Sequence, residues 1–343
     1  MKKNLIRMAV MVACGTCSAL AAAAEIKSVS VSGLVEVAVG TVNDYDGDNA
    51  SGVVLQTAEL TTEAVVNEWT SASVTILHED DAPDTWEVDA GTITLGNLDK
   101  KPYYLTMGRM YVPFGNFATH LVTDPLTLEL AEIRETAVQL GYVADNLSGS
   151  FFMFNGDTNT AGDDDTMQQF GFNIDYVMEK SGVTMEMGGA YISNIADSEL
   201  ITDSLGVFPT TLDSYVPGIS AYFNYLRGPM SFMFEYIEAQ SDFDAAELAF
   251  DGDGAKPSAY KLEFGYDFKQ SGRDMTAAIA YQSTSEAVDL GLPEKRLSFG
   301  LSIALFENTT LGLEYLADTD YGTGDGGTGD KATAMGAQLA VEF

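Results

Sequence analysis

The chain has 343 residues, 51 of them Asp or Glu and only 17 Lys or Arg, so its formal net charge is −34. An acidic balance this strong argues against nucleic acid as a partner, because phosphates are bound by cationic side chains. Hydrophobic residues make up 46% of the chain, which is not the composition of a disordered polymer. We therefore expect a folded protein that binds neither DNA nor RNA.

The first 24 residues have the pattern of a secretory signal peptide. Lys2, Lys3 and Arg7 make a basic start, and a short apolar run follows from Met8. Ala22–Ala24 then offers a small-residue cleavage site. Cleavage after Ala24 would leave residues 25–343, which contain no cysteine and hence no disulfide. The alternatives are a membrane anchor over the same residues and a lipid anchor on Cys14 or Cys17.

Alternation with a period of two dominates the rest of the chain. Around residues 170–176, 260–268 and 297–305, bulky apolar side chains alternate with small, polar or charged ones. One face is aromatic and the other is rich in glycine and charge, as expected of strands between lipid and a water-filled lumen. The prediction is a lipid-facing set of Phe170, Phe264, Phe299 and Leu301, and a lumen-facing set of Asn173, Lys261, Glu263 and Ser298.

The pattern predicts an all-β fold, a transmembrane antiparallel β-barrel of about 16 strands. A soluble β-sandwich is the alternative, but the runs are longer than the five or six residues of a usual globular strand. Short turns alternate along the chain with long, acidic connections, which also favours the barrel. The expected strands cover residues 28–42, 52–67, 70–79, 86–95, 102–110, 135–145, 148–156, 167–179, 182–195, 214–226, 229–241, 257–269, 273–285, 293–305, 309–318 and 331–343.

Most of the negative charge falls in the long connections, which the barrel pattern places on the outward side. One interpretation is a rim that attracts cations, and the other is simple solvation of the loops. The aspartate-rich stretches 44–49 and 251–254 could hold divalent ions, but neither completes a calcium loop with Glu at its twelfth position. We therefore expect no metal site and no cofactor.

The third long connection, residues 111–134, is more apolar and less acidic than the others. Pro113 and Pro125 cannot donate to a β-ladder, so we do not expect regular sheet throughout. Residues 124–133 could form a helical turn, with Asp124 as its cap and Pro125 at the first helical position. Folding into the barrel would bury its apolar side chains, and the alternative is a surface loop packed on itself. The apolar set is Phe114, Phe117, Leu121, Leu126, Leu128, Leu130 and Ile133.

Two stretches of this region, GRMYVPFGNF and DPLTLELAEIRETAVQLGY, are distinctive. Together they resemble the signature of the LbtU family of siderophore porins, which are outer-membrane barrels linked to uptake of ferric siderophores. The resemblance covers residues 108–142 and implies ferric siderophores as candidate solutes; in sixteen-stranded porins the third outward loop typically folds into the pore. The positions that match the family's motif are Pro113, Phe114, Gly115, Asp124, Pro125, Glu132, Arg134 and Glu135.

Charged residues of this region define a candidate constriction. Arg109 and Arg134 would place positive charge among Glu129, Glu132 and Glu135, and opposite charges across a pore orient polar solutes. The alternative is that Arg134 only pairs with a neighbouring carboxylate and holds the loop. Inward positions on later strands add Lys261, Glu263 and Arg296 to the candidate pore lining.

These features predict a bacterial outer-membrane porin for passive, plug-free diffusion of small solutes, with ferric siderophores as the solute that the resemblance implies. The alternative is a general, cation-preferring diffusion porin. An enzyme is not expected, because His78 and His120 have no nucleophile motif beside them. A plugged receptor with twenty-two strands would need a longer chain. The expected partners are small solutes, outer-membrane lipid and lipopolysaccharide, two further copies in a homotrimer, and the barrel-assembly machinery, which would read the terminal Phe343.

Overall fold

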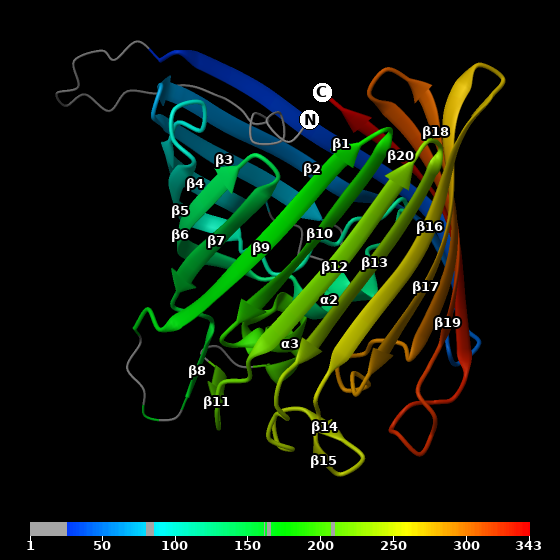
Figure 1. Cartoon of the computed structure of the whole chain (residues 1–343). Helices are drawn as coiled ribbons and strands as arrows, with labels where there is room; N and C mark the ends of the chain where they lie inside the picture. Colours follow the sequence, from blue (N-terminus) through cyan, green and yellow to red (C-terminus); the bar gives the residue numbers. More distant parts are fainter. Residues whose placement is uncertain (1–25, 80–85, 161, 163–165, 207–209) are drawn as a thin grey trace.

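The computed structural model describes residues 26–79, 86–160, 162, 166–206 and 210–343. Within them, sixteen antiparallel strands follow one another in chain order and close into a single barrel (Figure 1). The predicted all-β barrel is therefore confirmed. The predicted signal peptide lies outside the described residues.

The strands of the barrel are long and span nearly the whole described chain. They are β1 (Ser28–Asn43), β2 (Asn49–Asn67), β3 (Thr70–Glu79), β4 (Glu87–Gly96), β5 (Tyr103–Tyr111), β6 (Arg134–Ala144), β7 (Leu147–Phe154), β9 (Gln169–Lys180), β10 (Val183–Ile192), β12 (Gly218–Arg227), β13 (Met230–Ala239), β16 (Ser258–Gln270), β17 (Arg273–Ser285), β18 (Lys295–Phe306), β19 (Thr309–Thr319) and β20 (Lys331–Glu342).

The predicted strand ranges agree with these bounds to within a few residues, apart from one connection. Residues 193–195 and 214–217 were expected to be strand and are not. Pro217 has no N–H to give to a ladder, so β12 begins only after it. At the other end of the connection, the Asn194 side chain donates to Thr158 Oγ1 at 2.7 Å and is part of a buried polar network instead of a strand.

The two faces of the strands separate as the alternation predicts. Phe170, Phe264 and Phe299 are 37–45% exposed, whereas Lys261 and Glu263 are each 1% exposed. Ser298, next to Phe299, is fully buried. Exposed apolar side chains on one face and polar groups on the other are the pattern of a barrel that meets lipid outside and encloses a polar interior.

The two ends of the barrel differ. Short turns join β6 to β7, β9 to β10 and β16 to β17, with positive φ at Asp145, Ser181 and Ser271, as tight hairpins need. At this end Phe343 and Gly33 exchange two backbone hydrogen bonds of 2.9 and 3.0 Å, which complete the closure between β20 and β1. Figure 1 shows the C-terminus on this side.

The opposite end carries the long connections and the small elements (Figure 1). These are the helix α2 (Leu126–Ala131), the 3-10 turn η1 (Ile195–Asp197), the helix α3 (Glu199–Leu205), the parallel pair β8 (Thr158–Thr160) and β11 (Thr210–Leu212), and the hairpin β14 (Ala249–Phe250) and β15 (Asp253–Gly254). In the part of the chain that the structure describes, no helix has the length and apolar character to cross a membrane.

A charge placed on the apolar face should cost stability according to its depth. Phe299→Arg, near the middle of β18, should lower the free energy of unfolding by about 2–4 kcal/mol, because arginine at the bilayer midplane is strongly unfavourable. Phe306→Arg, at the short-turn end of the same strand, should cost about 0–1 kcal/mol. Denaturant unfolding in phospholipid vesicles measures both, and equal losses would contradict the assignment of faces and depth.

Candidate functional site

The hairpin of β5 and β6 continues beyond its neighbours in the barrel wall. The two strands pair with each other as far as Tyr111 and Arg134. However, β4 pairs with β5 only as far as Arg109, and β7 pairs with β6 only from Ala137. The end of the hairpin therefore has no ladder partner on either side, and it leads into residues 112–133, here called the crossing segment.

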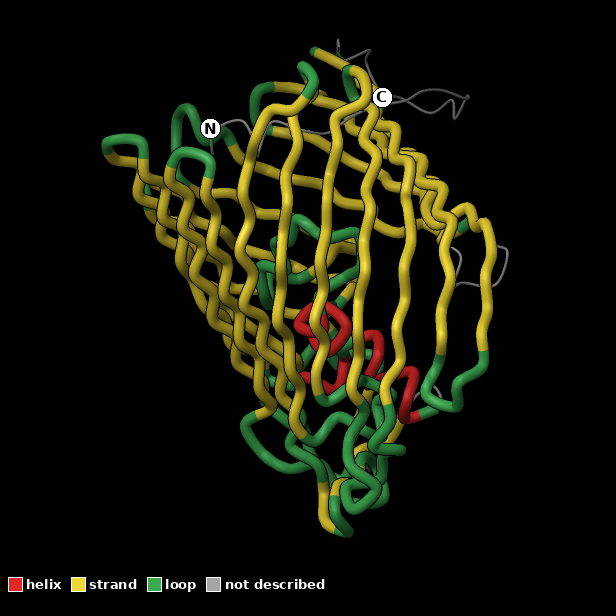
Figure 2. Tube along the Cα trace, turned by 90° about the vertical axis from the view of Figure 1, so that its right-hand side faces the viewer, coloured by secondary structure: helices red, strands yellow, loops and turns green. Residues whose placement is uncertain are grey.

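The crossing segment is anchored by apolar side chains. Val112, Phe114, Leu126, Leu130 and Ile133 are at most 6% exposed. They belong to one buried cluster with residues of β7, β13 and β16, namely Phe152, Phe154, Ile237 and Ala259. Phe117, Leu121 and Leu128, which were also expected to be buried, are half-buried. In Figure 2 the helices and part of the loop lie behind the strands of the near wall.

The helix in this segment is shorter than the sequence suggested. It spans Leu126–Ala131 and has Pro125 at its N-cap, without a side-chain cap. The expectation that Asp124 would cap it, with Pro125 at the first helical position, is therefore wrong by one residue. Proline has no side-chain acceptor with which to cap the helix. The first N–H of the helix finds its acceptor on a strand of the barrel, since Leu126 N–H donates to Gln282 Oε1 at 2.7 Å.

Polar side chains from four strands accept hydrogen bonds from the backbone of the crossing segment. Glu263 on β16 accepts from His120 N–H at 2.7 Å, and Gln282 on β17 accepts from Leu126. Glu314 on β19 accepts from the N–H groups of residues 122 and 123 at 2.6 and 2.9 Å. An irregular chain has no ladder, so these acceptors replace the partners that a strand would supply.

Glu235 on β13 makes the most extensive of these contacts. Its Oε1 accepts from Asn116 N–H at 2.6 Å, and its Oε2 accepts from Phe117 N–H at 3.1 Å and from Thr127 Oγ1 at 2.8 Å. Gly115 and Phe117 both have positive φ, of 124° and 55°. Their backbone conformation directs successive N–H groups toward one carboxylate, as in an anion-binding nest. A Cβ at Gly115 would lie 2.3 Å from the Phe117 ring, so this position needs glycine.

Lys261 and Glu263 also hold the crossing segment. The Lys261 ammonium donates to the carbonyl oxygen of Ala118 and lies 3.9 Å from Glu263 Oε2. Glu263 in turn accepts from Thr119 Oγ1 at 2.7 Å. Both charged side chains are at most 1% exposed, so they are occupied by the segment and do not face open solvent.

Arg134 lies among three carboxylates, two from β4 and one from α3. Its Nη1 pairs with Glu87 and, at 2.8 Å, with Asp89, while its Nε lies 2.8 Å from Oε1 of Glu199 on α3. Its side chain is 13% exposed, against 41% for Arg109, whose Nη2 lies 3.9 Å from Glu87. The arrangement of Arg134 corresponds to the alternative in which it pairs with carboxylates and holds the connection.

Glu132 is next to this cluster, where the helix α2 ends. Burial, together with the nearby carboxylates of Glu199, Asp124 and Glu79, raises the pKa of its carboxyl from 4.5 to about 8, against the lowering effect of Arg134. A hydrogen bond of 3.0 Å from Glu199 N–H to the Glu132 carbonyl joins α3 to the crossing segment. The carboxyl is therefore mostly neutral at pH 7 in the folded protein.

The other predicted site residues are separate from this cluster. Arg296 makes a bidentate pair with its cross-strand neighbour Asp318, with both N–O distances at 2.9 Å. Glu135 is buried on the face of β6 opposite to Arg134. Pro113 is half-buried and Pro125 buried. Among the described residues no ion pair joins Arg134 to Lys261 or to Arg296.

The wall formed by the first four strands is acidic and rich in hydroxyl groups. Residues 28–99 contain no Lys or Arg. Glu59 and Thr61 alternate with the exposed Leu60. Thr61 Oγ1 donates to Glu59 at 2.5 Å and lies within hydrogen-bond distance of Thr75 Oγ1, at 2.9 Å. Glu36 pairs in register with Thr57 on the same inner face. Cations therefore have an attractive surface that is not interrupted by basic side chains.

Sequence reasoning missed the wall acceptors that hold the crossing segment. Glu235, Gln282 and Glu314 are far from residues 112–133 in the sequence, so no local motif links them. One signal was available, because each of these residues is a polar position in a strand where apolar residues alternate. This pattern predicts that the side chain faces inward. It does not predict which residue the side chain contacts, because that depends on how the whole barrel closes.

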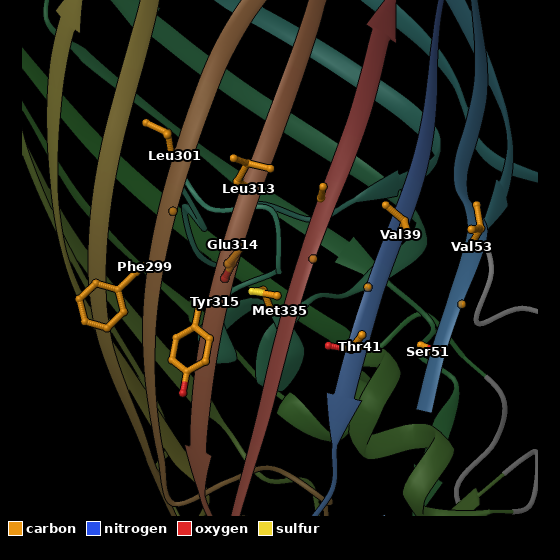
Figure 3. Close-up of a pocket in the computed structure, with 15 residues that line it drawn as sticks. Val39, Thr41, Ser51, Val53, Phe299, Leu301, Leu313, Glu314, Tyr315 and Met335 are labelled. Atoms are coloured by element: carbon orange, nitrogen blue, oxygen red, sulfur yellow. The ribbon is translucent and has the colours of Figure 1, made fainter. Parts of the chain in front are cut away.

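The outer face carries an apolar groove of about 810 Å³ between β18 and β2. Phe299, Leu301, Tyr315, Met335 and Val53 point out from its walls (Figure 3). Its floor is made of small residues, Gly52, Gly336 and Ala337. A surface of this kind suits contact with acyl chains or with another apolar protein surface.

The two histidines have different neighbours. His120 Nε2 lies 2.8 Å from Ser231 Oγ, and the His78 ring lies tilted against Trp86, with 5.8 Å between the ring centroids. Within the described ranges no group of three or more His, Asp or Glu side chains is placed to hold a metal ion, and this includes the aspartates of 44–49 and 251–254.

A closed antiparallel barrel with an apolar outer face, a polar inner face and long connections at one end is an outer-membrane channel. A family model for Gram-negative porins matches residues 9–343. The chain belongs to this family, and its location is the bacterial outer membrane. The family and the fold indicate a channel for diffusion and not an enzyme.

Curated relatives and solved structures agree with this assignment. An UPF0422 protein of Coxiella burnetii is 30% identical over 316 residues, which cover 90% of this chain and 68% of the relative. An UPF0422 protein of Legionella pneumophila is 29% identical and is covered to 66%, so the chain spans about two thirds of these relatives.

The solved structures show the fold alone, because their sequences are distant. An anion-selective porin from Comamonas acidovorans has a TM-score of 0.64 at 15% identity, with 92% of this chain and 99% of that chain covered. The outer-membrane channel DcaP of Acinetobacter baumannii has a TM-score of 0.63 at 13% identity, with coverages of 92% and 96%. OmpT of Vibrio cholerae in a trimer form has a TM-score of 0.55 at 12% identity, with coverages of 92% and 98%.

Removing the Glu235 carboxylate should loosen the crossing segment. Glu235→Leu leaves the Asn116 and Phe117 N–H groups without their acceptor, at a cost of about 1–3 kcal/mol. Hydrogen exchange of peptides from 112–133 should then become roughly ten- to a hundredfold faster. The control is Glu238→Leu, on the same strand as Glu235. It removes an ion pair with Lys256 and should change the exchange of peptides from 112–133 little. Equal effects of the two variants would contradict the proposed anchoring.

The pKa of Glu132 should make the crossing segment more stable in acid. Its carboxyl has the ordinary pKa of 4.5 when unfolded and about 8 when folded, so stability is lost as pH rises from about 4.5 to about 8. Glu132→Gln should remove most of this loss. The measurement is the protection of peptides from 126–133 at pH 5 and pH 8, after correction for intrinsic exchange. Glu307→Gln, in an exposed turn, should keep the wild-type dependence; if Glu132→Gln also kept it, the assignment would be wrong.

Proposed function

We propose that this porin is a passive diffusion channel whose lumen is narrowed by the crossing segment, and that it passes cations in preference to anions. The observation that carries the proposal is the set of hydrogen bonds from residues 116–126 to the polar faces of β13, β16, β17 and β19. A connection that starts at β5 and is held by these strands passes across the barrel. Such a segment reduces the open cross-section and fixes it, because the four acceptor side chains that hold it are buried.

The charge distribution supports cation preference. The first four strands contribute carboxylates without any basic side chain over residues 28–99. Two cations of the later strands lie beside carboxylates, since Lys261 is 3.9 Å from Glu263 and Arg296 is paired with Asp318. Arg109 is the more exposed of the two arginines at the hairpin end, and it lies 3.9 Å from Glu87. The balance is an acidic path, which concentrates cations and repels anions.

The oligomer is proposed to be a homotrimer, with the long connections outside the cell and the short turns in the periplasm. The apolar groove on the outer face offers small residues at which another copy could approach closely. A trimer form is described for OmpT of Vibrio cholerae, which shares the fold. The terminal Phe343 remains the proposed recognition point for barrel assembly.

Uptake of ferric siderophores is a second candidate function, which rests on the resemblance of residues 108–142. The acidic wall adds a constraint on this candidate, because it would repel anionic iron chelates and admit neutral or cationic ones. Brief current blocks by ferrioxamine, a cationic hydroxamate chelate, would support it. Absence of blocks at millimolar concentration would leave a general cation-preferring porin.

Single-channel recording of the purified protein in planar bilayers tests the proposed function. In a potassium chloride gradient the reversal potential should show preference for potassium, and the preference should weaken as salt screens the carboxylates. Deletion of residues 116–130 should raise conductance, because it removes the segment that crosses the lumen. The barrel should still form, since its ladders do not include these residues.

Deletion of residues 322–328, which lie in the connection between β19 and β20, is the matched control and should leave conductance unchanged. Preference for chloride would overturn the electrostatic part of the proposal. Unchanged conductance after deletion of 116–130 would overturn the constriction.

A further inference from the structure

A carboxylate and two tyrosines form a separate group on the inner wall, beside the crossing segment. Asp175 on β9 accepts a hydrogen bond from Tyr222 on β12, at 2.8 Å from its Oδ1, and one from Asn173 Nδ2, at 2.6 Å from its Oδ2. Asn224, two residues after Tyr222 on the same face, donates to Asn116 of the crossing segment at 2.9 Å. The group therefore borders the proposed constriction.

Glycines on neighbouring strands make room for both tyrosine rings. A Cβ at Gly188 on β10 would lie 2.5 Å from Asp175 Oδ1 and 2.5 Å from a Cε1 atom of Tyr222. A Cβ at Gly141 on β6 would lie 2.0 Å from Cζ of Tyr104. Each ring thus lies across the backbone of the next strand. Tyr104 extends from β5 across β6, which is the side on which β7 and then β9, the strand of Asp175, follow.

Hydrogen bonds orient the Asp175 carboxylate, but no cationic side chain of the described residues pairs with it. Gln139 Nε2 donates to Ser150 Oγ at 2.9 Å, and Ser150 Oγ donates to Asn173 Oδ1 at 2.6 Å, which turns the Asn173 amide toward Asp175. Each oxygen of Asp175 keeps a further lone pair for a ligand. Among the described residues, Asp175 has no ion-pair partner, in contrast to Glu263 and Asp318. Its side chain is half-buried and can be reached from the lumen.

Glu186 adds a second negative charge beside the group. It lies on β10, two residues before Gly188 and on the same face, and it pairs in register with Asn224. Among the described residues it too has no ion-pair partner. A cation at this place would meet two carboxylates and the faces of two electron-rich rings, a combination that favours ammonium over a hydrated alkali ion or a neutral polyol.

We propose that Asp175, Tyr104 and Tyr222 form a subsite for the ammonium group of an organic cation that passes through this pore. The inference rests on the proposed diffusion function and adds a solute class to it, namely amines. Asp175 supplies the charge and hydrogen-bond acceptor, and the rings supply cation–π contact. Glu186 raises the local concentration of cations.

The experiment uses 1,4-diaminobutane as the probe and 1,4-butanediol as its uncharged equivalent, in single-channel recordings of the full-length protein. Diaminobutane should reduce the wild-type potassium current in a saturable manner, and butanediol should not. Asp175→Asn should raise the half-blocking concentration at least about fivefold, and Tyr222→Leu should raise it about two- to fivefold. Asp267→Asn removes one wall carboxylate, bonded to Thr276 at 2.7 Å, and should leave the block near wild type.

The outcomes separate this inference from the proposed function. A wild-type channel that prefers potassium but is blocked equally in Asp175→Asn and Asp267→Asn would overturn the subsite and leave the function intact. Preference for chloride would overturn the function itself. Heat-modifiable migration in gel electrophoresis shows whether the Asp175→Asn barrel is folded. If it is not, Tyr222→Leu and Tyr104→Leu replace it. Weaker block by diaminobutane in both variants supports the subsite, and wild-type block in both rejects it.

Discussion

Every backbone N–H and C=O that lies in lipid must find a partner within the protein, and the structure follows from this requirement. The sixteen strands satisfy it by closing on themselves, with Phe343 and Gly33 completing the last ladder. The crossing segment leaves the ladder and needs other acceptors. Glu235, Glu263 and Glu314 provide them, so the polar positions of the strands serve the backbone of a segment that is distant in sequence.

The same requirement divides the inner carboxylates into two classes. Glu235, Glu263 and Glu314 are buried against the crossing segment and act as fixed hydrogen-bond acceptors. Glu36 and Glu59 on the first two strands, together with Asp175 and Glu186, have no ion-pair partner among the described residues. The negative charge that matters for transport is therefore smaller than the formal charge of the chain. The path of a cation then depends on individual side chains and not on net charge alone.

The sequence predicted the barrel well because period-two alternation is a local property of each strand. It placed Phe264 and Glu263 on opposite faces correctly, since one step along a strand decides this. It located the crossing segment from its prolines and apolar residues. It did not reveal that Glu235 holds Asn116, or that Arg134 meets Glu199, because these contacts depend on how distant strands close around the segment. The cap of α2 was misplaced by one residue, since Asp124 and Pro125 both fit a helix start and only the backbone geometry decides.

The long sequence separation of these anchors has a consequence for assembly. Asn116 and Val122 are bound by residues 119 and 192 positions further along the chain. The crossing segment therefore cannot dock until the second half of the barrel has formed, and contacts of such high order form late and slowly. Until then its apolar side chains lack their partners on β13 and β16. Docking of the crossing segment is thus the closing step of folding, so a barrel that closes incorrectly would leave this segment without its anchors.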